Sequence, residues 1–137
     1  MKPGIINRRR ALQAIGVAAL APTLVQSAHA AGEPFHIFFN YGEAEPPASA
    51  KPIVDALRST LKKNSKVTFT GHCDTSEPNA GALGMTRAVA VLKAMTEAAL
   101  PADVQLTVVS KAATSLLIKT AANVREPQNR RVAILIT

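Results

Sequence analysis

The stretch of sequence that decides the fold covers residues 66–89 and reads KVTFTGHCDTSEPNAGALGMTRAV. In its first part, Val67 and Phe69 alternate with polar neighbours, which predicts a half-buried strand over Lys66–His72. The next part is rich in Asp, Thr, Ser, Glu, Pro and Asn, the residue types of loops. Apolar residues then recur at helical spacing, so a helix is expected over Leu83–Ala99. The stretch therefore predicts a strand, a polar loop and a helix in succession.

The residues on either side predict three more strands and one more helix. A run rich in aromatic and β-branched residues opens this region, and an apolar run closes the chain. The order of elements favours an α/β chain, an α+β sandwich of βαβαβ type with a mixed sheet and two main helices on one face. The elements are a strand over Phe35–Tyr41, a helix over Ser49–Lys63 that Ser49 could cap, a strand over Val104–Ser110, an irregular or partly helical connection over Ala112–Arg130, and a strand over Val132–Ile136.

The charge of the chain is unevenly distributed. Its 137 residues contain 16 Lys and Arg against 9 Asp and Glu, a formal net charge of +7. Four of the basic residues fall in the first ten positions, and no acid precedes Glu33. Without residues 1–30 the balance is 12 − 9 = +3. This small charge, with 4% aromatic residues and no Trp, argues against nucleic acid as a partner.

Residues 1–30 have the three parts of a secretory signal peptide. A basic start is followed by a short apolar run and by small residues that predict cleavage after Ala30. The apolar run is shorter than the roughly 20 residues that a membrane span needs, so no stable span is expected after processing. The pair Arg8 and Arg9 resembles a twin-arginine export signal. An ordinary export signal is the alternative.

Three motifs in the rest of the chain resemble the periplasmic OmpA-like domain, a family that binds peptidoglycan. Its members have a strand ending in Gly-His-Thr-Asp, a helix opening with Leu-Ser-x-x-Arg-Ala, and an Asn-Arg-Arg-Val segment before the last strand. The corresponding segments here are Gly71–Asp74, Leu83–Val89 and Asn129–Val132, in the same order. The resemblance implies one OmpA-like domain over residues 31–137.

The resemblance also implies the ligand and its two main contacts. In the family, the Asp and the helix Arg bind diaminopimelate of the peptidoglycan stem peptide, and the matching residues here are Asp74 and Arg87. A diaminopimelate side chain can present an ammonium and a carboxylate on one carbon, so a carboxylate and a guanidinium placed close together suit it. Second-rank candidates for ligand binding are Thr75, Asn79, Asn129 and Arg130.

A non-covalent wall-binding protein of the periplasm of a Gram-negative-type bacterium, associated with the cell wall or the outer membrane, is therefore expected. No cofactor, metal or catalytic residue is implied. Envelope proteins are further candidate partners. The family pattern is not complete: the loop between Asp74 and Arg87 is a couple of residues shorter than usual, Gly84 stands in place of Ser, and Cys73 stands in place of Thr.

These departures leave alternatives open. Asp74 could simply cap a loop, and Arg87 could be a solvated helix charge. The altered segment Ser76–Gly84 suggests a degenerate OmpA-like scaffold that contacts proteins in the envelope and does not bind peptidoglycan. A thiol or metal enzyme built on Cys73, the single cysteine, is disfavoured because neighbouring strand residues point to opposite faces, so His72 cannot easily join it at one atom.

Overall fold

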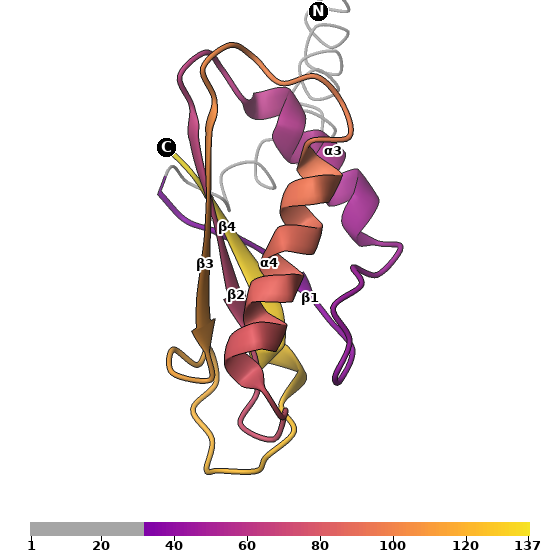
Figure 1. The fold of residues 1–137 in the computed structure, drawn as a ribbon, viewed down its shortest axis with the longest axis vertical. Coiled ribbons are helices and arrows are strands. Elements are labelled where there is room, and N and C mark those ends of the chain that lie inside the picture. Colours follow the sequence, from indigo (N-terminus) through magenta and orange to yellow (C-terminus); the bar gives the residue numbers. More distant parts are fainter. Residues whose placement is uncertain (1–31) are drawn as a thin grey trace, which may run out of the picture. The chain divides into compact units, whose positions relative to one another are not determined.

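A four-stranded sheet with two helices on one of its faces makes up the domain (Figure 1). The structure is a computed structural model and describes residues 32–137; the signal peptide predicted for residues 1–30 lies outside the described residues. The mixed α/β fold predicted from the sequence is confirmed. Its elements are β1 (Phe35–Phe38), α3 (Ala50–Thr60), β2 (Lys66–His72), α4 (Ala80–Met95), β3 (Gln105–Ala112), the 3-10 helix η1 (Pro127–Asn129) and β4 (Arg131–Ile136).

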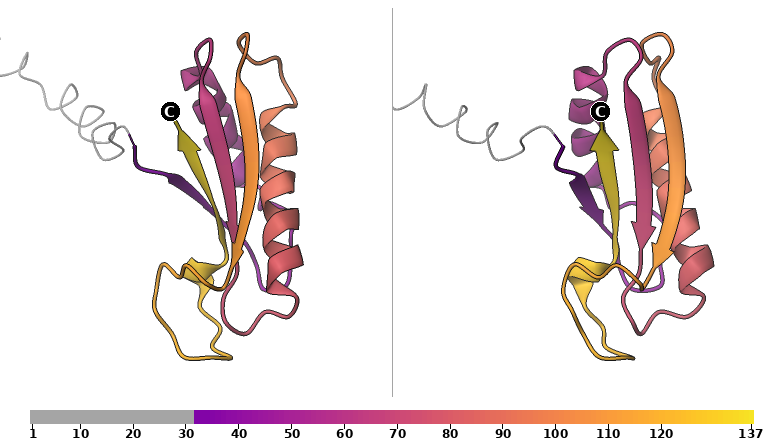
Figure 2. Two further views of the ribbon diagram at one scale, coloured as in Figure 1. Left: turned by 60° about the vertical axis from the view of Figure 1, so that its left-hand side comes forward. Right: turned by 90° about the vertical axis from the view of Figure 1, so that its left-hand side faces the viewer.

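The strands lie side by side in the order β1-β4-β2-β3. β2 and β3 are parallel and are joined through α4, whereas β4 runs antiparallel to both β1 and β2. In the central pair, Phe69 lies opposite Ile134. Figure 2 shows the result: the ends of β2 and β3, the start of α4 and the start of β4 meet at one end of the domain. This is the end that carries the predicted site.

The core lies between the sheet and the helices. Because side chains alternate along a strand, Phe69 and Ile134 both face the helices, and neither is exposed. Val54 and Leu57 of α3 and Val91 of α4 are buried in the same cluster. The remaining buried apolar residues of this cluster are Ile37, Phe39, Ala50, Leu61, Val67, Ala88, Met95 and Val132.

Two glycines allow α4 to approach β2 closely. A Cβ atom on Gly71 would lie 1.7 Å from the carbonyl oxygen of Gly84, and a Cβ atom on Gly84 would lie 2.6 Å from Oγ of Ser110. Neither position has room for a side chain. The glycine that replaces the family's Ser at position 84 therefore has a packing reason, because the helix backbone passes directly over β2 and β3 there.

Several predicted boundaries were wrong, and hydrogen bonds from arginine side chains to backbone carbonyls explain the end of β1. β1 ends at Phe38, not Tyr41, because the next carbonyls bind arginines: the Phe39 carbonyl accepts from Nε of Arg130 at 3.0 Å, and the Asn40 carbonyl accepts from Nη2 of Arg87 at 3.1 Å. Helix α4 begins at Ala80, three residues before the predicted Leu83, and ends at Met95 instead of Ala99. Asn79 precedes α4 with a left-handed φ of 52°.

Helix α3 lies within its predicted span, but Ser49 makes no side-chain capping bond. Its last turn is tied to the end of α4 by Arg58, whose guanidinium donates to the carbonyls of Ala94 at 2.7 Å and Met95 at 2.9 Å. These carbonyls carry the negative end of the α4 dipole, so a cation is favourable there. Arg58 therefore satisfies the end of α4 at the residue where the helix stops.

Candidate functional site

Asp74 lies two residues after the end of β2, and its carboxylate is fully buried. One oxygen accepts from the backbone N–H of Ser76 at 2.9 Å and from its hydroxyl at 2.8 Å. The other accepts from the backbone N–H of Glu126 and from Nη1 of Arg130, both at 3.1 Å. Burial opposes ionisation, but the bonds from Ser76 and Arg130 outweigh it, and the pKa of Asp74 is lowered below its ordinary value. Asp74 is thus an ionised carboxylate that connects its own loop with Glu126 before η1 and with Arg130 after it.

Arg87 lies in the second turn of α4, and its side chain is also fully buried. Nε donates to the carbonyl of Glu43 at 2.8 Å, and Nη1 donates to the carbonyl of His72 at 3.1 Å. Nη2 donates to the Asn40 carbonyl. The ring of Phe39 lies below the guanidinium, 5.3 Å from Cζ. Every nitrogen of Arg87 therefore has an acceptor inside the domain.

Glu77 is the partner that the sequence analysis missed. Its Oε1 accepts from Nη1 of Arg87 at 2.8 Å, its Oε2 accepts from Nη2, and neither side chain is exposed. Oε1 also accepts from the backbone N–H of Asp74 at 3.0 Å, and Oε2 from that of Gly42 at 2.8 Å. The sequence feature that could have indicated this partner is the position of Glu77, an acid in the loop between Asp74 and Arg87.

Asp74 and Arg87 come to the same end of the sheet, but they are connected through Glu77 and not through a shared cleft. The Glu77 carboxylate binds the backbone of Asp74 and the guanidinium of Arg87. The side chain of Asp74 instead contacts Arg130. Both predicted ligand contacts are thus buried and paired within the chain in this conformation.

The second-rank candidates divide into residues that hold loops and one that is exposed. Thr75 Oγ1 donates to the Ala121 carbonyl at 2.7 Å and accepts from the N–H of Val124 at 3.0 Å, so it anchors the connection after β3. The buried Asn129 bonds the backbone of Leu117 and Ile118. Arg130 pairs with Asp74, as described above. Asn79 is exposed at the start of α4 and makes no capping bond.

Cys73 lacks the environment of an activated thiol. Its side chain is fully buried on the helix side of the sheet, and its Sγ lies 3.3 Å from the Ala80 carbonyl. Burial raises the pKa of Cys73 to about 11, against a partial opposing effect of Arg87. Because the thiolate is the nucleophile, this shift disfavours the thiol-enzyme alternative. No group of three or more His, Cys, Asp or Glu able to hold a metal occurs in residues 32–137.

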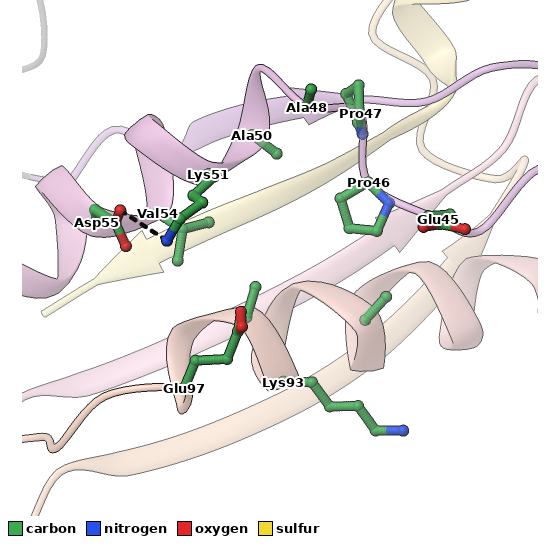
Figure 3. A pocket seen from close by; sticks show the side chains of 12 residues that line it. Glu45, Pro46, Pro47, Ala48, Ala50, Lys51, Val54, Asp55, Lys93 and Glu97 are labelled. Carbon is green, nitrogen blue, oxygen red and sulfur yellow. Dashed lines mark hydrogen bonds and ion pairs between the residues drawn. The ribbon is translucent and has the colours of Figure 1, made fainter.

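An open groove lies between α3, together with the segment that leads into it, and the exposed side of α4 (Figure 3). Its volume is about 370 Å³. Apolar atoms of Pro46, Val54 and Ala94 line it, and charged residues such as Lys51 and Glu97 lie at its rim. The groove is separate from the buried Asp74, Glu77 and Arg87.

No helix of the described domain is both long and apolar enough to cross a membrane.

Sequence comparison finds one family whose model matches this chain. The model of the OmpA family matches residues 38–130, which includes both Asp74 and Arg87. No curated protein sequence matches the chain.

Solved structures with the same fold share little sequence with it. The peptidoglycan-associated lipoprotein from Burkholderia pseudomallei is 18% identical with a TM-score of 0.62, over 74% of this chain and 89% of that one. The periplasmic domain of Helicobacter pylori MotB is 16% identical with a TM-score of 0.64, over 78% and 83%. The OmpA-like domain of FopA1 from Francisella tularensis is 18% identical with a TM-score of 0.55, over 75% and 71%.

Proposed function

Because the chain belongs to the OmpA family, we propose that its folded domain binds peptidoglycan without a covalent bond. The domain would cover residues 31–137, and residues 1–30 would direct its export to the periplasm of a Gram-negative-type bacterium. A solved structure with the same fold is named a peptidoglycan-associated lipoprotein, which supports the same class of ligand. The protein would then act as a wall-binding piece of the envelope.

The observation that carries this proposal is the setting of Arg87. Its two terminal nitrogens bind the two oxygens of one carboxylate, the arrangement by which arginine recognises a carboxylate ligand. Here that carboxylate belongs to Glu77. A free carboxylate of the stem peptide, such as that of diaminopimelate, has the same shape and charge. We therefore propose that the ligand carboxylate replaces Glu77 on Arg87.

Asp74 would supply the second half of the recognition. An ammonium of the stem peptide needs an ionised acceptor, and the lowered pKa of Asp74 keeps its carboxylate charged at neutral pH. The carboxylate is at present shared with Arg130, whose side chain is 12% exposed. Arg130 is thus a partly exposed, charged partner of Asp74, and we propose that its release admits the ammonium. Thr75 and Asn129 would hold the surrounding loops.

Co-sedimentation with purified sacculi tests the proposal. The purified protein should sediment with sacculi, Asp74→Asn should reduce the bound fraction at least tenfold, and Lys63→Gln, which removes an exposed charge, should bind as the wild type does. A Glu77→Gln variant should bind more strongly, because a neutral amide competes less well for Arg87. Thermal melts must show that each variant is folded. Absence of the wild type and of Glu77→Gln from the pellet would overturn the proposal.

One observation favours a second candidate function. Glu77 already pairs with Arg87, so the buried guanidinium does not need a ligand. A scaffold that contacts envelope proteins and does not bind peptidoglycan would have such an internally paired arginine. The groove between α3 and α4 offers a surface for such a contact. This candidate predicts that neither the wild type nor Glu77→Gln binds sacculi, although both are folded. The sedimentation experiment therefore separates the two functions.

A further inference from the structure

The face of the sheet opposite the helices carries a cluster of basic side chains. Val132 faces the helices and pairs with Gly71, the last pair of the β2–β4 register, so the neighbouring residues Arg131 and His72 project from the opposite face. Arg131 and His72 lie on adjacent strands at the end where the connection after β3 crosses the sheet. Ser115 of that connection contacts both of them.

Arg131 is buried, and most of its hydrogen-bonding capacity is unused. Its relative exposure is 6%, and the buried Nε and Nη1 atoms have no acceptor among residues 32–137. Only Nη2 has one, the carbonyl of Ser115 at 3.4 Å, which is long for such a bond. His72 is 5% exposed, and its Nδ1 also has no partner in the described domain. The side chains of Arg131 and His72 therefore both have buried nitrogen atoms without a hydrogen-bond partner in the described domain.

Three of the other arginines in residues 32–137 differ from Arg131. Arg58, Arg87 and Arg130 each bind a carboxylate, at no more than 3.1 Å. The strands around Arg131 cannot supply one, because FHIF, KVTFTGH, QLTVVSKA and RVAILI contain no acid. A buried guanidinium without a counter-charge is strongly unfavourable. A negative partner from outside the domain would remove this penalty.

The charged groups that shift the pKa of His72 most are basic. Burial is the largest cause, followed by the positive charge of Arg131, by His36 on β1 and, with a smaller effect, by Lys111 on β3, and together they lower the pKa of His72 to about 4. The contact with the Ser115 backbone acts in the opposite direction. Among the described residues, no acid is one of the main causes of this shift. The cluster thus has the electrostatics of an anion site.

We propose that this face binds one oxyanion, a carboxylate or a phosphate group, which accepts hydrogen bonds from the guanidinium of Arg131 and lies against His72. The anion replaces the long contact from Arg131 to Ser115, so the segment around Ser115 moves outward when it binds. The movement is confined to the residues around Ser115, which is exposed, because the backbone of Leu117 and Ile118 after it is held by Asn129. The site lies on the opposite face from the helix-side pair of Glu77 and Arg87.

Thermal melts and NMR with simple anions test the site. Inorganic phosphate and acetate are titrated at pH 7 against sodium chloride of equal ionic strength. The melting temperature should rise by about 5 °C at a tenfold excess over the dissociation constant. The Nε–H resonance of Arg131 should shift with the same saturation curve. A rise with phosphate alone identifies a phosphate site, and a rise with acetate as well identifies a general oxyanion site.

Two charge-matched variants complete the test. Arg131→Gln should lose the anion-dependent rise, whereas Lys63→Gln should retain it in full. Equal rises in all three proteins, or an Arg131 resonance that does not respond, would overturn the proposal. The NMR titration uses only the wild type, so it remains decisive if Arg131→Gln does not fold. No peptidoglycan enters these measurements, and Arg131→Gln should still bind sacculi, so failure here is distinct from failure of the proposed function.

Discussion

Glu77 binds Arg87 with both carboxylate oxygens, and neither side chain has any exposed surface. The arginine that the family resemblance assigns to ligand recognition therefore already holds an internal carboxylate. Glu77 lies in a loop a couple of residues shorter than is usual in the family, only three positions after Asp74. Its oxygens also bind the backbone of Asp74 and Gly42, so the pair joins β2, α4 and the loop after β1.

The first prediction concerns the energy of this pair. Glu77→Gln leaves the positive charge of Arg87 buried without a counter-charge. Arg87→Gln leaves the negative charge of Glu77 buried without a counter-charge. Each single variant should lower the free energy of unfolding by about 3 to 5 kcal/mol, as is typical when one partner of a buried ion pair is removed. The double variant should cost at least about 2 kcal/mol less than the sum of the two.

Urea unfolding at pH 7 measures all four proteins of this cycle. The pair Lys51 and Asp55 is the matched control, because it is an exposed ion pair in α3 at a separation of four residues. Its coupling should be close to zero, because exposed ion pairs contribute little to stability. A coupling between Glu77 and Arg87 as small as that of the control pair would contradict the structure.

Strand β2 was predicted from the sequence to the residue because alternation is a local signal. The start of α4 was missed because Ala80, Gly81 and Ala82 have no amphipathic pattern. The left-handed backbone of Asn79, which precedes the helix, could not be predicted from the residue type alone. Residue type and motif place Asp74 and Arg87 at one end of the sheet. They do not reveal Glu77, because its partner lies ten residues away in another element. Side-chain pairing across elements is decided by packing, which no local pattern records.

The second prediction uses the close approach of α4 to β2. Gly71→Ala would place a methyl group 1.7 Å from the backbone oxygen of Gly84, so the helix must move. A loss of about 3 kcal/mol or more in the free energy of unfolding is expected, at the upper end for overpacked sites. Gly81→Ala is the control, because its Cβ meets nothing within 4 Å in the same helix, and it should stabilise the protein by up to about 1 kcal/mol. Equal effects of the two in thermal melts would refute this packing.

The third prediction concerns export. Residues 1–30 have a basic start with Arg8 and Arg9 and a weakly apolar run. If the twin-arginine route is used, replacing both arginines by lysine should leave unprocessed precursor in the cytoplasm, although the charge is unchanged. Pulse labelling and fractionation measure this. Normal processing of the lysine variant would instead indicate the general secretory route.

The fourth prediction follows from the buried His72. Its pKa is about 4 in the folded protein and 6.5 as the ordinary value, so below pH 6.5 the unfolded chain takes up a proton that the folded one does not. The free energy of unfolding should therefore be intact above pH 6.5 and fall as the pH drops toward 4, by about 3 kcal/mol in all. Urea unfolding at pH 7, 6, 5 and 4.5 measures the slope.

His72→Gln provides the control for this slope, because its side chain cannot titrate. Its stability should change little between pH 7 and 5, while the wild type loses stability. Asp74 does not account for a loss in this window, because its pKa is lowered in the folded protein and its contribution is lost only at more acid pH. Added phosphate should reduce the wild-type slope if an oxyanion binds beside His72, since the anion favours the protonated ring in the folded state. An identical slope in the wild type and in His72→Gln would show that His72 is protonated as easily in the fold as outside it.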